Sequence, residues 1–262
     1  MKLSFSTRGW SDLSWDTMMD TAEEMDFNGI EVYNIHKFES LTGKGGPFHK
    51  YNTQATARDL KRRHLAIPVF DTSVDISDKE DPVPVLKELI DTAYNMYVEY
   101  IGVTAQFDDE VQVRKNLDIL LPYAAEKKVA ILIKTTGIYS DTARLRALMD
   151  SYASDSLAAL WDVHHPCRDW GESAADTIKN LGAYVKHVHM RDSDNESNYN
   201  LIGEGSLPIE DFMRALYSID YDGFISMEWK RGWMEDITDL EIIFPYFVNY
   251  MHRFEDTRGC LR

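Results

Sequence analysis

The side chains best suited to chemistry are acidic, imidazole and basic groups gathered in three short segments. These segments are Trp161-Asp162-Val163-His164-His165-Pro166, His187-Val188-His189-Met190-Arg191-Asp192 and Phe224-Ile225-Ser226-Met227-Glu228-Trp229. Each segment places polar residues at the end of an apolar run, where a buried polar group needs a partner. Asp, His and Glu donors that converge from neighbouring strands suit a divalent metal such as Mn²⁺, Zn²⁺ or Mg²⁺.

The elements that must position these segments alternate regularly along the chain. Strands are predicted at residues 3–7, 30–33, 66–71, 100–104, 129–135, 158–163, 184–190 and 223–229. Helical patterns follow them: one begins after Ser14, others cover residues 53–64, 141–149, 172–181, 208–218 and 238–254, and two more lie near Pro84 and Leu117. The strand ends are roughly 25 to 40 residues apart, which is the size of a βαβ repeat.

This alternation predicts an α/β protein, a single (β/α)₈ TIM barrel domain over residues 1–262. A doubly wound open sheet is the alternative. It is disfavoured because Thr7-Arg8-Gly9-Trp10 follows the first strand, where such a sheet carries a glycine-rich phosphate turn.

Composition and charge exclude several classes of partner. The 262 residues include 28 Lys and Arg and 44 Asp and Glu, for a net charge of −16. We therefore expect no nucleic-acid partner and no anionic membrane partner, because both need a basic face. No apolar run is long enough for a membrane span. The two cysteines, Cys167 and Cys260, fit a reducing cytoplasm. A homo-oligomer, and a place as one domain of a longer chain, both remain open.

Barrel enzymes carry their active sites at the carboxyl ends of the strands. Besides the three segments, this rule selects Arg8, Trp10, Glu31, Tyr33, Phe70, Asp71, Lys134, Thr136 and Lys230. Trp10, Tyr33 and Trp229 could stack on the faces of a sugar ring, with core packing as the alternative. We interpret His187 as a core or supporting histidine and His164 as structural.

The chain resembles the xylose isomerase-like sugar isomerase/epimerase barrels from Leu3 to about Phe254. The specific motifs are Asp162-x-x-His165, His187-x-His189-x-Arg191-Asp192, Gly203-Glu204-Gly205 and Glu228. The resemblance implies a metal bound by Asp162, His189 and Glu228. It also implies that His165 binds substrate and that Arg191 matches the basic residue of the family's His-x-Lys-Asp pattern.

One position departs from the family. The fifth strand ends in Lys134, where the resemblance implies a glutamate that binds the metal and shares acid/base work with Glu228. Lys134 could bridge Asp162 and Glu228 as a built-in cation, act as a catalytic amine, or turn to solvent and leave a three-ligand metal site. We prefer the bridge, because neighbouring carboxylates raise the pKa of an amine rather than lower it.

These residues predict an isomerase or epimerase of a sugar, sugar phosphate or polyol that abstracts a proton next to a carbonyl. Glu228 would be the base, a divalent metal or Lys134 the electrophile, and His165 and Arg191 would hold substrate oxygens. The alternative is a metal-free barrel that binds a sugar-like metabolite without catalysis. DNA repair endonucleases share this type of barrel, but a charge of −16 disfavours DNA binding.

Overall fold

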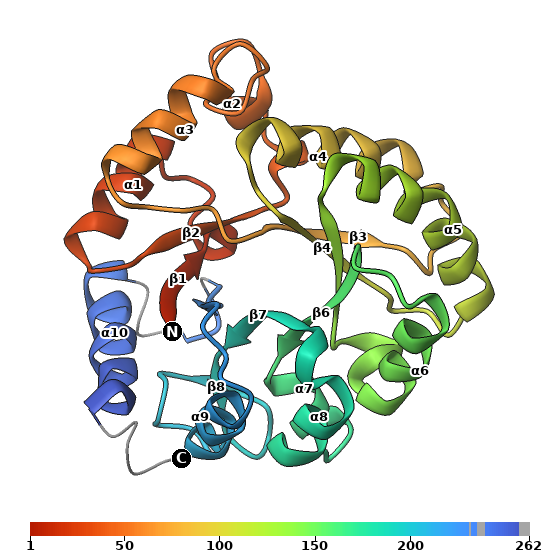
Figure 1. The fold of residues 1–262 in the computed structure, drawn as a ribbon. Coiled ribbons are helices and arrows are strands. Elements are labelled where there is room, and N and C mark those ends of the chain that lie inside the picture. The colour runs from red at the N-terminus through yellow and green to blue at the C-terminus, as the bar shows by residue number, and fades with distance from the viewer. Residues whose placement is uncertain (231, 235–238, 257–262) are drawn as a thin grey trace.

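The structure is a computed structural model that describes residues 1–230, 232–234 and 239–256, without the side chains of residues 255 and 256. Within these residues, parallel strands close into a barrel in the spatial order β1-β10-β7-β6-β5-β4-β3-β2 (Figure 1). The strands are β1 (Lys2–Ser6), β2 (Gly29–Tyr33), β3 (Phe70–Asp75), β4 (Tyr100–Thr104), β5 (Ala130–Lys134), β6 (Leu157–Asp162), β7 (Val185–Met190) and β10 (Phe224–Met227). The predicted TIM barrel is therefore confirmed.

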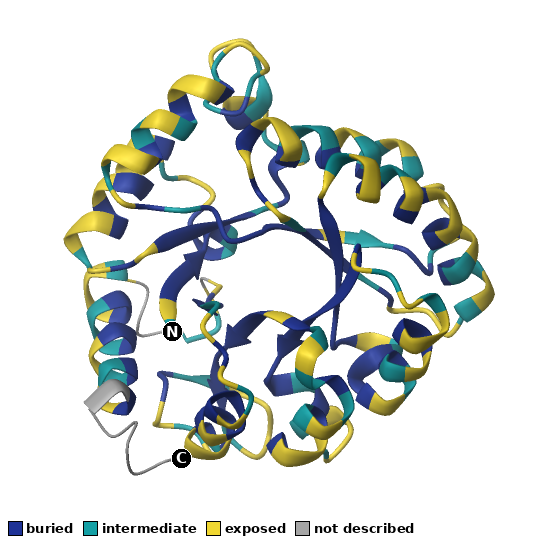
Figure 2. Ribbon diagram, in the orientation of Figure 1, coloured by how far each residue is buried: buried dark blue, intermediate teal, exposed yellow. Residues whose placement is uncertain are grey.

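Helices surround the barrel and bury their apolar faces against it (Figure 2). The long helices are α1 (Trp15–Glu24), α3 (Thr53–Arg62), α4 (Val83–Met96), α5 (Glu110–Lys127), α6 (Thr142–Tyr152), α8 (Ala174–Leu181), α9 (Ile209–Ser218) and α10 (Leu240–Asp256). Shorter elements are α2 (Glu39–Thr42), α7 (His164–Asp169) and an antiparallel pair, β8 (Asp192–Ser193) and β9 (Tyr199–Asn200). Short 3₁₀ turns cover Thr7–Gly9, Ile35–Lys37, Gly137–Ser140 and Gly182–Tyr184.

The alternation of side chains along each strand decides which groups face the inside of the barrel. Leu132 of β5 and Leu160 of β6 pack together in a small cluster separate from the main core beneath the helices. Lys134 is two positions beyond Leu132, and Asp162 is two positions beyond Leu160. Both charged side chains therefore point into the barrel at its carboxyl end.

The third strand begins later than predicted. We expected residues 66–71, whereas β3 runs from Phe70 to Asp75, and Ala66 makes only an isolated bridge to Gly29. Pro68 interrupts the predicted run, and proline cannot donate a ladder hydrogen bond. The strand's later start leaves Asp71 near its beginning rather than at its end.

Two helix boundaries also differ from the predictions. Glu172 precedes α8 instead of starting it, because the Ser173 side chain accepts the N–H of Asp176 and so caps the helix. The short helix α7 was not predicted, although it carries His164 and His165 at its start. The predicted final helix included Thr238, which lies outside the described residues; α10 begins at Leu240.

None of the described helices is long and apolar enough to cross a membrane.

The predicted cap of α6 gives a test of the fold. The Asp141 carboxylate accepts hydrogen bonds from the backbone N–H groups of Ala143 and Arg144, at 3.1 and 3.2 Å. Replacing such a cap lowers stability by about 1 kcal/mol. Asp141→Ala should lower the free energy of unfolding by that amount in urea denaturation. The exposed Asp155→Ala should change it by less than about 0.5 kcal/mol; equal effects would contradict the capping role.

Candidate functional site

The carboxyl ends of the strands surround a polar cavity of about 350 Å³. It is lined by Arg8, Tyr33, Ser73, Asp75, Thr104, Gln106, Lys134, Thr136, Asp162, His165, Arg191 and Glu228. Eight of these residues were selected from the sequence as strand-end groups: Arg8, Tyr33, Lys134, Thr136, Asp162, His165, Arg191 and Glu228. The cavity therefore lies where a TIM barrel places its chemistry.

Arg191 joins the two buried carboxylates of the cavity. It donates from Nη2 to Oδ2 of Asp162 at 2.5 Å and from Nη1 to Oε2 of Glu228. Arg8 donates to the other oxygen, Oε1, of Glu228. Arg191 is only 4% exposed as a side chain, whereas Arg8 is 32% exposed. Glu228 is thus held by one buried and one accessible guanidinium.

The prediction that Lys134 bridges Asp162 and Glu228 is wrong. Lys134 Nζ instead donates to Oδ2 of Asp71 at 2.8 Å. The strand order explains the difference, because β7 lies between β6 and β10. Arg191, directly after β7, is therefore flanked by both carboxylates, while Lys134 on β5 lies on the far side of Asp162 and reaches across the barrel interior to β3.

A second ion-paired group lies on the inner face of β2 and β7. The Glu31 carboxylate oxygen Oε2 is 2.8 Å from Nε2 of His187 and 2.9 Å from Nε2 of His189. His187 Nε2 also lies 2.9 Å from the hydroxyl of Ser226. All four side chains are buried. His187 therefore has the supporting position expected for it.

Neighbouring charges shift the pKa values of His189, Glu228 and Lys134. Burial alone would lower the pKa of His189, but the carboxylates of Glu31, Glu228 and Asp71 together outweigh it and raise that pKa to about 9. Burial would raise the pKa of Glu228, but Arg191, His189 and Arg8 together hold it well below its usual range. The pKa of Lys134 is raised, because Asp71, Glu228 and Tyr33 together outweigh the effect of burial. At neutral pH His189, Glu228 and Lys134 are therefore all charged.

Two of the predicted substrate-binding residues line the cavity beside Arg191. His165 lies at its edge with Nδ1 2.6 Å from Oδ2 of Asp169, while its Nε2 is 3.9 Å from Oδ2 of Asp162. Tyr33 lies beneath Arg8 and Lys134, whose cationic centres are 5.2 and 5.6 Å from its ring centroid. Both residues are placed to touch a ligand in the cavity.

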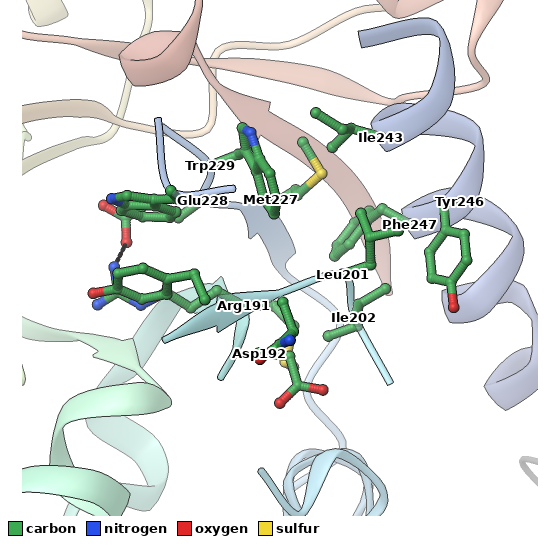
Figure 3. A pocket seen from close by; sticks show the side chains of 14 residues that line it. Arg191, Asp192, Leu201, Ile202, Met227, Glu228, Trp229, Ile243, Tyr246 and Phe247 are labelled. Carbon is green, nitrogen blue, oxygen red and sulfur yellow. Dashed lines mark hydrogen bonds and ion pairs between the residues drawn. The ribbon is translucent and has the colours of Figure 1, made fainter. Parts of the chain in front are cut away.

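The other two predicted aromatic residues lie away from this cavity. Trp10 is fully buried and packs edge-on against Phe244 at 5.2 Å between ring centroids. Trp229 is 4% exposed and lies next to Met227, in an apolar region (Figure 3). These positions correspond to the core-packing alternative.

The Gly203-Glu204-Gly205 motif forms a loop whose backbone binds the side chain of Asp192. Oδ2 of Asp192 accepts the N–H groups of Gly203 and Gly205 at 2.8 and 3.0 Å, and Oδ1 accepts that of Leu207 at 3.1 Å. A Cβ atom at Gly205 would lie 2.2 Å from Oδ1 of Asp192. Glycine is needed here because the loop backbone approaches the carboxylate so closely, and the loop is thereby fastened next to Arg191.

Three groups of side chains among the described residues have potential ligand atoms within 4.8 Å of one another. They are Asp162, His189 and Glu228; Glu31, His187 and His189; and His164, His165 and Asp169. The first is the predicted metal set, so its donors do converge.

This donor set does not fit a divalent metal in the arrangement described. Arg191 already bonds both carboxylates of the set, at one oxygen of each. His189 directs Nε2 at Glu31, and with a pKa of about 9 it is an imidazolium at neutral pH. A metal needs the neutral imidazole as ligand. The fourth donor implied by the family resemblance is replaced by the ammonium group of Lys134.

The fold and motifs agree with what comparison with known proteins finds. The model of the xylose isomerase-like TIM barrel family matches residues 19–242, so the chain belongs to this family. A curated relative, fructoselysine 3-epimerase of Shigella flexneri, is 20% identical over 90% of this chain and 92% of its own length.

Solved structures with the same fold include sugar epimerases. D-psicose 3-epimerase from Clostridium cellulolyticum H10, solved with D-tagatose, superposes with a TM-score of 0.79 and 13% identity, covering 97% of this chain and 99% of the other. The 3-keto-D-glucoside 4-epimerase from E. coli gives a TM-score of 0.78 and 14% identity over the same shares. At these identities the superpositions establish the shared fold.

The sequence marks Glu31 and Asp71 as strand-end residues but indicates no role for either. Both carboxylates are fully buried and pair with His189 and Lys134 respectively. The signal for Glu31 was a lone acidic residue inside the apolar run Ile30-Glu31-Val32. A buried carboxylate of this kind must have a cationic partner, but its identity depends on contacts across the barrel.

The Glu31–His189 pair predicts a pH dependence of stability. Because folding raises the pKa of His189 from 6.5 to about 9, the pair contributes fully below pH 6.5 and its contribution is lost as pH rises through about 9. The free energy of unfolding should fall over this range by on the order of 3 kcal/mol. Urea denaturation across the range measures this slope.

Glu31→Gln removes the charge that favours the imidazolium and should flatten the slope. His64→Gln, at an exposed position, is the matched control and should leave the slope unchanged. A slope that persists undiminished in folded Glu31→Gln would contradict this assignment.

Proposed function

We propose that the protein is an isomerase or epimerase that acts on a sugar or polyol bearing a carbonyl group, by moving a proton on the adjacent carbon. The observation that carries the proposal is the cavity itself, where an ammonium group, guanidinium groups and carboxylates line one polar space of about 350 Å³. Enolate chemistry needs a base for the carbon-bound proton and a cation for the developing oxyanion. Family membership and the epimerase relatives support the same reaction class.

Lys134 is the electrophile in this proposal. Asp71 is the only described residue with a hydrogen bond to its ammonium group, which has three N–H donors, so donors remain for a substrate carbonyl oxygen. Its raised pKa keeps it protonated at neutral pH, as an oxyanion stabiliser must be. The same shift disfavours the catalytic-amine alternative, which requires the neutral form.

Glu228 is the proposed base, and Arg8 controls its basicity. With both oxygens bonded to arginines, Glu228 is a weak proton acceptor. Arg8 is the accessible partner, so a substrate oxygen that binds Arg8 would free Oε1 to take the proton. The C–H electron pair then forms the enolate double bond, the carbonyl oxygen becomes an oxyanion beside Lys134, and return of a proton to carbon completes the reaction. His165 and Tyr33 would contact the substrate from the cavity edge.

A second candidate function is supported by the same two arginines. A carboxylate that both arginines keep paired cannot act as a base, and the protein would then be a metal-free barrel that binds a sugar-like metabolite. The cavity's hydroxyl and amide groups, from Thr104, Thr136 and Gln106, suit such a ligand equally well.

Proton exchange in deuterated water separates the two functions. Ketohexoses such as D-fructose and D-tagatose, their phosphates and keto-polyols are incubated with the protein and followed by NMR. We expect deuterium to enter at a carbon next to the carbonyl of one substrate. Glu228→Gln should slow this exchange by about 10² to 10⁴-fold, and Lys134→Gln by about 10² to 10³-fold.

Lys230→Gln is the matched control, because Lys230 is an exposed lysine close to the mouth of the barrel; it should exchange at the wild-type rate. Undiminished exchange in folded Glu228→Gln would contradict its role as base. Saturable binding of a panel member with no exchange in the wild-type protein would contradict catalysis and favour the binding function.

A further inference from the structure

We propose that Arg191 is the resident cation of this site: its guanidinium replaces the divalent metal that the family resemblance implies, and the chain binds no such metal between Asp162 and Glu228. This inference concerns how the site is built, and it does not depend on the proposed activity. It rests on the contacts of Arg191, on the ion pairs of the buried carboxylates, and on Lys134, which stands where the resemblance implies the fourth metal ligand.

The position of Arg191 matches the predicted metal position. The carboxylates of Asp162 and Glu228 and the ring of His189 supply ligand atoms within 4.8 Å of one another. Arg191 bonds one oxygen of each carboxylate, and Nδ1 of His189 lies 4.0 Å from the same Glu228 oxygen. A planar guanidinium with several N–H donors can join two carboxylates in this way. A compact ammonium group is less suited to this role.

Aromatic rings hold Arg191 in this position. The guanidinium carbon lies 5.4 Å from the ring centroid of Tyr199 and 5.5 Å from that of Trp233. The two rings stack on each other at 3.9 Å. Cation–π contacts of this kind are strongest where water is excluded, and Arg191 is buried. Displacing it would therefore break two ion pairs and two ring contacts together.

Four buried carboxylates around the cavity are each paired with a cation without a metal. Among the described residues, the buried carboxylates of Glu31, Asp71, Asp162 and Glu228 pair with His189, Lys134, Arg191 and Arg8. Asp75 at the rim is already bonded by the N–H groups of Ser77 and Gln106. An added dication would be an unpaired charge in a low-dielectric interior, which is strongly unfavourable.

The two substitutions that would restore a metal site follow from this geometry. Arg191→Met removes the resident cation while keeping an unbranched side chain, and Lys134→Glu supplies the fourth donor and removes a second cation. In the double variant the carboxylates outnumber the cations by three, so the site attracts a dication, and a bound metal would displace the proton of His189 and take its ring nitrogen as a ligand.

Mn²⁺ binding to the protein alone, measured by electron paramagnetic resonance and equilibrium dialysis after chelator treatment, tests the inference. The wild type should show no stoichiometric Mn²⁺ that depends on Asp162 and Glu228. The Arg191→Met/Lys134→Glu variant should bind about one Mn²⁺ per chain. Lys230→Glu is the matched control, and it should behave as the wild type.

Two results would overturn the inference. One is a wild-type protein that binds about one Mn²⁺ per chain and loses it in Asp162→Asn or Glu228→Gln. The other is a folded double variant, checked by circular dichroism, that binds no Mn²⁺, because Arg191 would then not stand in for a metal.

A thermal measurement on the wild type keeps the inference testable if the double variant does not fold. A metal that binds only the folded state raises the melting temperature. The melting temperature of the wild type should therefore be the same with Mn²⁺ and with chelator. A rise with Mn²⁺ that disappears in Asp162→Asn would overturn the inference. Neither measurement uses a substrate, so failure of the proposed activity does not affect either readout.

Discussion

The bonding of Asp162 and Glu228 to one buried arginine is the interaction on which the rest of the site depends. Closing the barrel brings β6, β7 and β10 side by side. It buries the carboxylate of Asp162 at the end of β6 and that of Glu228 at the end of β10. Two ionised carboxylates in such a place need a shared cation, because unpaired buried charge is costly. Arg191, at the end of the middle strand, meets that need, and the fastened Asp192 loop beside it keeps the backbone in place.

The other buried charges complete a network of fixed pairs around the same cavity. Lys134 pairs with Asp71 and His189 with Glu31, so each cation reaches a carboxylate on a distant strand. Arg8 differs from these groups because it is partly exposed and lies against Tyr33. The network therefore combines several buried ion pairs with one accessible cation, Arg8. A polar ligand would first interact with the site at Arg8.

The sequence predicted the barrel and the location of the site because both depend on local patterns. Strand–helix alternation defined the architecture, and polar ends of apolar strands selected Asp162, Lys134 and Glu228 correctly as cavity groups. The partners of these groups were not predictable in the same way. Lys134 pairs with Asp71 rather than with Glu228, since pairing depends on the order of strands around a closed barrel. Trp10 likewise satisfies the strand-end rule, yet Phe244, far along the chain, covers it within the core.

Anomalous diffraction from crystals grown with Mn²⁺ would test the central claim most directly, because it locates the metal and the arginine in one map. We expect no manganese peak between Asp162 and Glu228, with the Arg191 guanidinium within hydrogen-bonding distance of both carboxylates. A manganese peak bonded to Asp162, His189 and Glu228, with Arg191 turned away, would contradict it.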